Sequence, residues 1–218
     1  KKTNRRLCSI FLKEKKVIPD YVTAIYDLNV SPITYDFSYF LAGAELFALK
    51  NKKRAFVVLF VLQDNQKIQN EVSEEYRIAV DEENMKWRFE NIILPLMSIY
   101  PACIGHSILL KRSDISKAVK GKILYPEFYS ERFPMADYYR EVYSSKNKIV
   151  GFSALIQGKR YIESWKKFNK INDQIITITL REYNYDTSRN SNVEEWVKFA
   201  KFISEKGFTP VFIPDTDA

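Results

Sequence analysis

The clearest structural pattern in the chain covers residues 174–215, which read QIITITLREYNYDTSRNSNVEEWVKFAKFISEKGFTPVFIPD. Its β-branched start, Ile175–Leu180, predicts a strand, and a polar loop, Arg181–Asn190, follows it. Helical spacing of apolar residues after Ser191 predicts a helix, and Val211–Ile213 predicts a second strand. A strand, a helix and a strand in this order predict a parallel crossover unit.

Two local signals bound the helix of this unit. Ser191, with Glu194 three residues later, matches a capping box, in which the serine is the N-cap. Gly207 is expected to end the helix, because glycine adopts the left-handed backbone that closes many helices. One face of the helix is apolar and is expected to pack on the strands: Val193, Trp196, Val197, Ala200 and Ile203.

The residues before this unit show the same alternation of strand and helix patterns, which is typical of a layered α/β fold with a mostly parallel sheet. Strands are predicted at Val22–Leu28, Ala55–Leu62 and Ala102–Leu110, and helices at about 36–49, 81–97 and 153–168. Ser113 and Asp114 favour a short further helix. Ile123–Tyr139, which contains two prolines and four tyrosines, is interpreted as a loop.

We expect three parts: a basic arm over residues 1–16, an α/β domain over 17–170, and the start of a second α/β domain over 171–218. Two parallel strands and one helix cannot close a core by themselves. The chain is therefore expected to stop inside the second domain and to be a truncated form of a longer protein.

The net charge of +7 is concentrated in the arm, where seven Lys/Arg and Glu14 give +6, so the rest of the chain is nearly neutral. A nucleic-acid-binding protein usually carries its basic excess on a folded face. We therefore expect no nucleic-acid partner, and interpret the arm as a solvated tail or a peripheral contact with a membrane or an acidic partner.

Cys8 and Cys103, the only cysteines, give neither a disulfide framework nor a metal-ligand spacing. The single histidine, His106, disfavours catalysis by a Ser/His or Cys/His pair. No metal site is expected, and a reduced, cytoplasmic location fits this cysteine usage. The longest apolar runs are too short to cross a bilayer.

The strongest candidate site is an anion site formed by Arg181, Arg189, Asn190 and Ser191. Ligands of open α/β sheets bind beyond the carboxyl ends of the strands. Arg181 follows a predicted strand, and Arg189 precedes a helix start, where amide groups and the helix dipole favour an anion. Two guanidinium groups that grip phosphate oxygens suit a nucleotide diphosphate. The alternative is that Arg181 pairs with a nearby carboxylate and that the loop only caps the helix.

Three aspartates complete the candidate set. Asp215 and Asp217 end the last predicted strand, where they would accept hydrogen bonds from ribose or sugar hydroxyls, or would simply be solvated. Asp27 ends the first strand, and in a two-domain transferase it would face the cleft as a general base. Its alternative role is turn formation. Neither G-x-G-x-x-G nor a P-loop occurs, which argues against a dinucleotide enzyme or a P-loop NTPase.

The strand that ends in an arginine, Ile176–Arg181, and the Thr/Asp-rich turn within Phe212–Asp217 resemble the second half of GT-B glycosyltransferases, most closely their fucosyltransferase-like branch. The string 175–217 is also similar to a group of uncharacterised bacterial proteins that are loosely described as glycosyltransferases. The resemblance implies a Rossmann-like first domain, a nucleotide-binding second domain, and an arginine that contacts the donor's diphosphate. It also implies transfer without a bound metal or a further cofactor, with a nucleotide-sugar as substrate.

The function expected from these features is transfer of a sugar from a nucleotide-sugar donor to a glycan or other acceptor. A non-enzymatic interaction or binding module of α/β fold stays open as an alternative. Another transferase with a GT-B-like frame, such as a polysaccharide pyruvyl transferase, also fits the same strand-arginine pattern.

Overall fold

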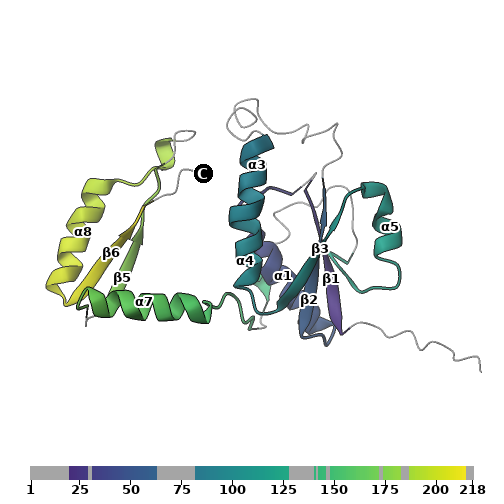
Figure 1. Cartoon of the computed structure of the whole chain (residues 1–218), viewed down its shortest axis with the longest axis horizontal. Coiled ribbons are helices and arrows are strands. Elements are labelled where there is room, and N and C mark those ends of the chain that lie inside the picture. Colours follow the sequence, from purple (N-terminus) through teal and green to yellow (C-terminus); the bar gives the residue numbers. More distant parts are fainter. Residues whose placement is uncertain are drawn as a thin grey trace, which may run out of the picture.

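The computed structural model of the chain describes residues 20–28, 31–62, 82–127, 140, 142–145, 148–171, 174–182 and 187–214. Within these residues the fold is α/β, with two separate parallel sheets (Figure 1). The first sheet has the strand order β3-β2-β1-β4, and the second pairs β5 with β6. The predicted α/β class with a parallel sheet is confirmed, whereas the basic arm 1–16 lies outside the described residues.

The first sheet consists of β1 (Tyr21–Asp27), β2 (Ala55–Val61), β3 (Cys103–Leu109) and β4 (Leu124–Tyr125). β1 and β2 pair along their whole length, and β4 pairs with the other side of β1 at Thr23 and Ala24. The prediction that residues 123–139 form only a loop is therefore wrong at its start. A strand of two residues is too short to show the alternation of apolar and polar residues from which strands are predicted.

Helices cover both faces of this sheet. α1 (Phe37–Lys50) and the helical run α3 (Glu82–Arg88), η1 (Phe89–Ile93) and α4 (Leu94–Ser98) lie on one face, and α5 (Ile115–Ala118) lies on the other (Figure 1). Alternate residues of β1 face the two layers, as the period of a strand requires. Val22, Ala24 and Tyr26 pack with α1, whereas Ile25 packs with the α5 layer.

The helix predicted at 81–97 is confirmed as a helical run from Glu82 to Ser98 that includes Pro95. The run contains a π-helical turn, η1, directly before Pro95, which occupies the first turn of α4. Proline lacks an amide hydrogen and clashes with the preceding turn of a regular α-helix. A wider π turn is a known way to absorb such an irregularity, so the segment stays helical and buries Ile92, Ile93 and Met97.

The second sheet follows α7 (Ile156–Phe168) and consists of β5 (Gln174–Thr179) and β6 (Phe208–Ile213), joined through η3 (Thr187–Arg189) and α8 (Val193–Glu205). The predicted crossover is confirmed, because β5 and β6 pair in parallel from Gln174 opposite Phe208 onwards. Gly207 ends α8 with a φ of +83°, as predicted. β6 begins three residues earlier than expected and includes Pro210, which the edge position of a two-stranded sheet tolerates.

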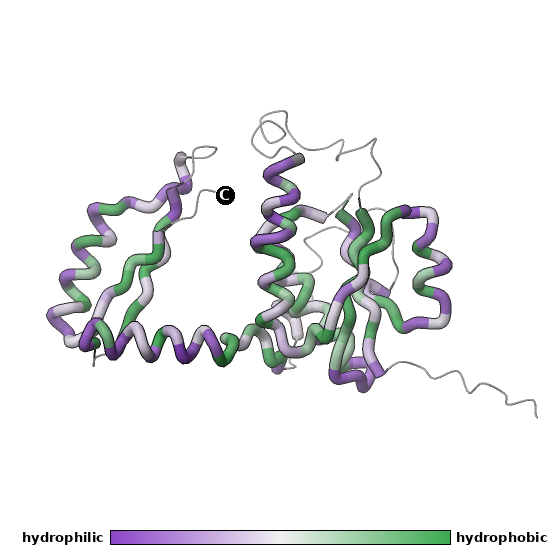
Figure 2. Tube along the Cα trace, in the orientation of Figure 1, coloured by the Kyte–Doolittle hydropathy of each residue, from purple (hydrophilic) through white to green (hydrophobic). Residues whose placement is uncertain are grey.

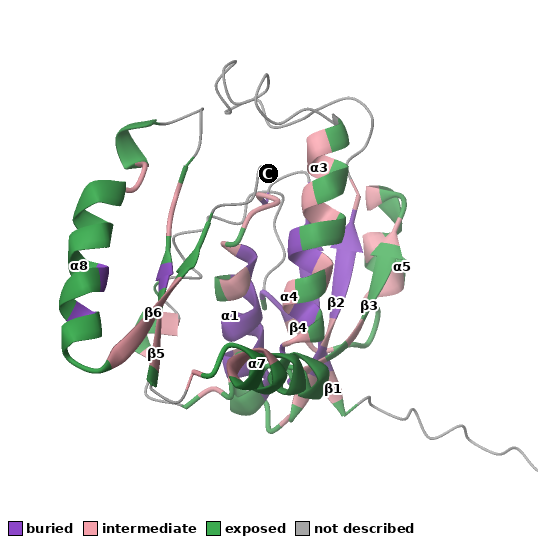
Figure 3. Ribbon diagram, turned by 60° about the vertical axis from the view of Figure 1, so that its left-hand side comes forward, coloured by how far each residue is buried: buried purple, intermediate pink, exposed green. Residues whose placement is uncertain are grey.

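The two sheets, with the helices that pack on them, differ in how many of their residues are buried. Figure 3 shows that buried residues concentrate in β1, β2 and α1, whereas α7 and most of α8 are exposed. The β5-β6 unit buries only a small cluster of Ile178, Ala200 and Ile203. The main core of the described residues therefore lies under the first sheet.

Gly43 on α1 provides a test of this core. A Cβ at Gly43 would lie 2.9 Å from Cζ of Tyr125, and nearer still to its hydroxyl. We expect Gly43→Ala to lower the free energy of unfolding by about 1–3 kcal/mol, because overpacking a core costs more than alanine gains in helix propensity. Chemical denaturation measures the change.

Gly158 is the matched control, because a Cβ there meets nothing within 4 Å and the residue also lies within a helix, α7. Gly158→Ala should stabilise the protein by up to about 1 kcal/mol. Equal effects of the two substitutions would contradict the packing of Tyr125 against α1.

Candidate functional site

The strand order β3-β2-β1-β4 creates a topological switch between β1 and β4. The chain builds the sheet in one direction from β1 to β3 and then returns to the other side of β1. In open α/β sheets, ligands bind at the carboxyl ends of the strands beside such a switch. Asp27, the last residue of β1, lies at this position.

Asp27 is buried and ion-paired. Its side chain is 2% exposed, and its Oδ2 lies 2.8 Å from Nη2 of Arg112, which is 23% exposed. Arg112 begins η2 (Arg112–Asp114), directly after β3 and before α5. Asp27 was predicted as a candidate residue, whereas Arg112 was not singled out. A carboxylate at the end of a buried strand requires a cation, and the polar stretch after the third predicted strand was the place to find it.

Hydrogen bonds connect the end of β1 to described residues between β1 and α1. The amide of Ser31 donates to the carbonyl of Asp27 at 2.9 Å, and the Tyr26 hydroxyl donates to the carbonyl of Pro32. The Thr34 hydroxyl donates to Asp36 at 2.9 Å, just before α1. These bonds hold the carboxyl end of β1 in one conformation and bring the polar turn residues to the edge of the sheet.

The second candidate edge is formed by the end of β5 and the start of α8. The amide of Arg181 donates to Oγ of Ser191 at 2.8 Å, and the amide of Ser191 donates to the carbonyl of Arg181 at 2.8 Å. The amide of Asn190 donates to the carbonyl of Thr187 at 3.1 Å and closes η3. The structure therefore joins the segment that carries Arg189, Asn190 and Ser191 directly to Arg181.

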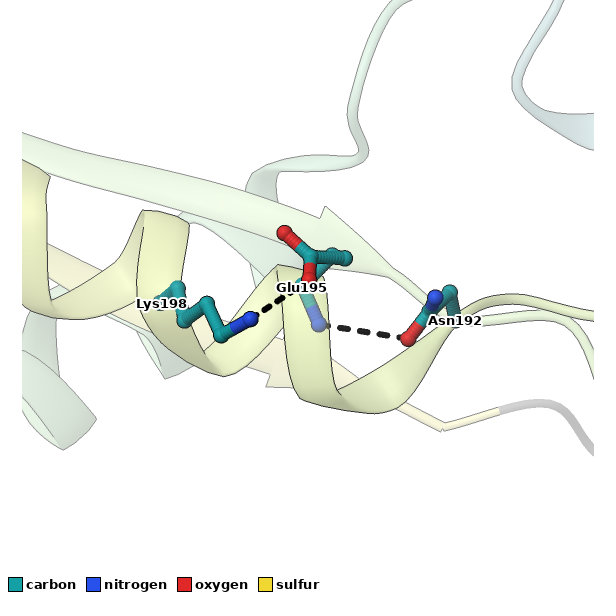
Figure 4. Close-up of polar contacts among 3 residues, drawn as sticks. All are labelled: Asn192, Glu195 and Lys198. Carbon is teal, nitrogen blue, oxygen red and sulfur yellow. Dashed lines mark hydrogen bonds and ion pairs between the residues drawn. The ribbon is translucent and has the colours of Figure 1, made fainter.

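The N-cap of α8 is one residue later than predicted. Ser191 does not cap the helix with Glu194, because its hydroxyl is engaged by the amide of Arg181. Asn192 is the N-cap instead, and its Oδ1 accepts a hydrogen bond from the amide of Glu195 at 3.3 Å (Figure 4). The Glu195 carboxylate pairs with Lys198 at 2.6 Å. Asn192, the next residue whose side chain can accept a hydrogen bond, therefore caps the helix.

The charges at this edge are mixed. Arg181 is half-buried and Arg189 is exposed, while Glu182, Glu194 and Glu195 are exposed carboxylates of the same region. Dissolved salt at about 0.1 M screens the interactions of exposed charges that lie more than about 10 Å apart. An anion bound here would therefore depend on direct contacts with the guanidinium groups and backbone amides rather than on a long-range positive field.

Asp215 and Asp217 lie outside the described residues. Among the residues that are described, no group of three or more His, Cys, Asp or Glu side chains is arranged to hold a metal ion. Within the same residues, every helix is too short or too polar to cross a membrane. The candidate residues that the structure places are Asp27, at the end of the first sheet's β1, and the group of Arg181, Arg189, Asn190 and Ser191 beside the second sheet.

A third polar cluster was not predicted. Glu45 of α1 is 3% exposed and accepts hydrogen bonds from the Tyr100 hydroxyl at 2.6 Å and from the amides of Val150 and Gly151 at 2.8 and 3.4 Å. Burial raises the pKa of Tyr100 well above its ordinary value, and the hydrogen bond to Glu45 and the charge of Glu45 raise it further.

The position of Glu45 was readable from the sequence. It lies four residues after Leu41 and three before Ala48, on the apolar face of the predicted helix. Tyr100 comes just before β3, at the amino end of the sheet and away from the carboxyl edges. The hydrogen bonds from Val150 and Gly151 to Glu45 therefore link the segment 148–151 to α1, and the role of the cluster is structural.

Searches against protein-family models, curated proteins and solved structures found no match for this chain.

Proposed function

We propose that this protein is a glycosyltransferase that transfers a sugar from a nucleotide-sugar donor to a glycan or other acceptor. The observation that carries the proposal is the pair of hydrogen bonds between Arg181 and Ser191, because it joins the two arginine-bearing segments at the carboxyl edge of β5. In the proposed GT-B-like arrangement, the first sheet belongs to the N-terminal domain and β5-α8-β6 belongs to the nucleotide-binding domain.

The proposed donor site uses both guanidinium groups. Arg181 and Arg189 bind the diphosphate and stabilise the charge that develops on it as the glycosidic bond to the leaving group breaks. Asn190 and the first turn of α8 supply hydrogen-bond donors, as helix starts do for phosphates. Asp215 and Asp217 are proposed to bind ribose or sugar hydroxyls.

Asp27 is the proposed general base that accepts the proton of the acceptor hydroxyl. Its position at the topological switch of the first sheet supports this role. Arg112, at 2.8 Å, holds the carboxylate in place. The nucleophile is the acceptor oxygen, which forms the new bond to the sugar carbon while the nucleoside diphosphate leaves with the bonding electrons.

Thermal melts with GDP, UDP and their sugar conjugates test the donor site. A ligand at about 100 times its Kd stabilises a protein by about 2.7 kcal/mol, which raises the melting temperature of a chain of this size by roughly 5–10 °C. We expect one nucleotide to produce such a shift and Arg181→Ala to abolish it.

Arg160→Ala is the matched control, because Arg160 is an exposed arginine of α7 that belongs to neither candidate edge. It should leave the shift intact. A shift that both substitutions reduce equally, or no shift with any nucleotide, would contradict the proposed donor site.

A second candidate function is that of an interaction module. The specific observation that favours it is the exposure of large apolar side chains on both helices of the C-terminal half, such as Phe168 of α7 at 86% and Phe202 of α8 at 55%. If the protein is an interaction module, nucleotides should leave its melting temperature unchanged, and its partner binding should depend on the exposed apolar faces of α7 and α8.

A further inference from the structure

Helix α7 combines an apolar face with a basic face. At 100° per residue, one arc of the helix and its N-cap carries Leu155, Gly158, Tyr161, Ile162, Trp165 and Phe168. The neighbouring arc carries four basic residues, one acid and, in the first turn, one apolar residue: Lys159, Arg160, Lys166, Lys167, Glu163 and Ile156. The alternation of apolar and polar residues along the helix is visible in Figure 2.

The apolar face of α7 is exposed. Tyr161, Ile162 and Phe168 are 68%, 47% and 86% exposed, Trp165 is half-buried, and no residue of the helix is buried. Val150, before the helix, is 70% exposed. Isolated apolar residues at a surface need no explanation, but a contiguous apolar face with a polar border marks an interaction site.

The charge of α7 indicates what the face binds. The helix carries a net charge of +3 over its 13 residues. A second copy of the same helix would bring like charges together, which opposes self-association. An anionic lipid surface offers acyl chains to the aromatic face and phosphates to the basic face, which is the environment that basic amphipathic helices rich in Trp and Phe prefer.

We propose that α7 docks this protein on an anionic lipid surface and lies parallel to it in the headgroup region. Tyr161, Trp165 and Phe168 insert toward the acyl chains, and the basic arc contacts lipid phosphates. The helix is about 20 Å long at 1.5 Å per residue, which is too short to span a bilayer. The proposal concerns attachment and does not depend on the proposed transfer reaction.

The attachment of α7 to the body supports a defined orientation. The amide of Ser153 donates to the carbonyl of Ile99 at 2.8 Å, and the Phe152 ring packs edge-on against Tyr100 at 5.0 Å. The carboxylate of Glu45 accepts hydrogen bonds from the amides of Val150 and Gly151. These anchors lie just before β3, at the amino end of the sheet.

The candidate edges lie at the opposite ends of the strands. Asp27 is the last residue of β1 and Arg181 lies just beyond the carboxyl end of β5, whereas α7 lies level with the amino ends of both sheets in Figure 1. A protein docked through α7 would therefore keep both carboxyl edges open to ligands.

Flotation of the full chain with lipid vesicles tests the proposal. We expect binding to vesicles of phosphatidylcholine with phosphatidylglycerol and weak binding to phosphatidylcholine alone. Lys159→Glu/Arg160→Glu should lower the partition coefficient by about 25-fold or more, because each basic residue near an anionic surface contributes about fivefold. Tyr161→Ser/Phe168→Ser should also lower it strongly. All four positions are exposed, and circular dichroism checks folding.

Lys117→Glu/Lys120→Glu is the matched control, because it makes the same change in net charge at exposed positions in and after α5. The basic arm is identical in every variant. Trp165 provides a second readout: with Trp87→Phe and Trp196→Phe it is the only tryptophan, and brominated acyl chains should quench its fluorescence.

Three results would overturn the proposal. They are equal binding to neutral and anionic vesicles, equal loss in the α7 variants and the control, and an unquenched Trp165 in bound protein. A lipid-free dimer that the α7 substitutions dissociate would assign the face to a second copy instead.

Discussion

Arg112→Ala is expected to lower the free energy of unfolding by about 3 kcal/mol. The substitution removes the cation that lies 2.8 Å from Asp27, whose side chain is only 2% exposed. Removal of one partner from a buried ion pair costs about 3–5 kcal/mol, because the other charge is left in a poorly solvated position. The lower end applies because Arg112 is 23% exposed and water reaches part of the site. Urea denaturation measures the change.

Asp27→Asn separates charge from packing at the same site. The substitution keeps the shape of the side chain, and the remaining cation, Arg112, is better solvated than Asp27. We therefore expect a smaller loss, of about 1–2 kcal/mol. If Asp27→Asn destabilised the protein more than Arg112→Ala, the ion pair would not be the interaction that holds the end of β1.

Glu45→Ala is expected to cost about 3 kcal/mol or more. It removes the acceptor of the buried Tyr100 hydroxyl and of two part-buried backbone amides, and leaves a cavity beside α1. A buried donor left without an acceptor costs about 1–3 kcal/mol, and the two amides and the cavity add to that loss. Glu45→Gln keeps an oxygen acceptor in nearly the same shape and should lose less. The matched exposed control is Glu205→Ala at the end of α8, which should change stability by less than about 0.5 kcal/mol.

The pH dependence of stability gives a second readout of the Glu45 cluster. The native state raises the pKa of Tyr100 above its ordinary value, so the unfolded chain releases this proton first, at about pH 10. Stability from Tyr100 is therefore present below about pH 10 and is lost as the pH rises further. Tyr100→Phe should remove this alkaline loss. An unchanged alkaline limb in that variant would contradict the burial of the hydroxyl beside Glu45.

The regular parts of the fold were predictable because they follow local rules. The uninterrupted apolar run of Ala55–Val61 indicated a buried strand, and the spacing of Phe37, Phe40 and Leu41 indicated a helix. Gly207 was correctly assigned as a helix end because its left-handed backbone is a local requirement. Each of these features depends only on residues close together in the chain.

The features that escaped prediction depend on tertiary contacts. β4 exists because Leu124 and Tyr125 pair with β1, about 100 residues earlier in the chain. The N-cap moved from Ser191 to Asn192 because the serine hydroxyl bonds to the end of β5. Arg112 was missed because its partner, Asp27, comes from another strand. A single sequence states which residues need partners, but not which distant residues supply them.

Amide NMR of the ¹⁵N-labelled chain, titrated with the nucleotide that gives the largest thermal shift, shows directly whether the nucleotide binds beside β5 and α8. We expect saturable shifts of the amides of Arg181, of residues 187–191 and of the first turn of α8, and we expect Arg181→Ala to prevent saturation. Saturable shifts confined to other parts of the molecule, or none while the nucleotide is in large excess, would contradict the claim that these arginine-bearing segments form a nucleotide site.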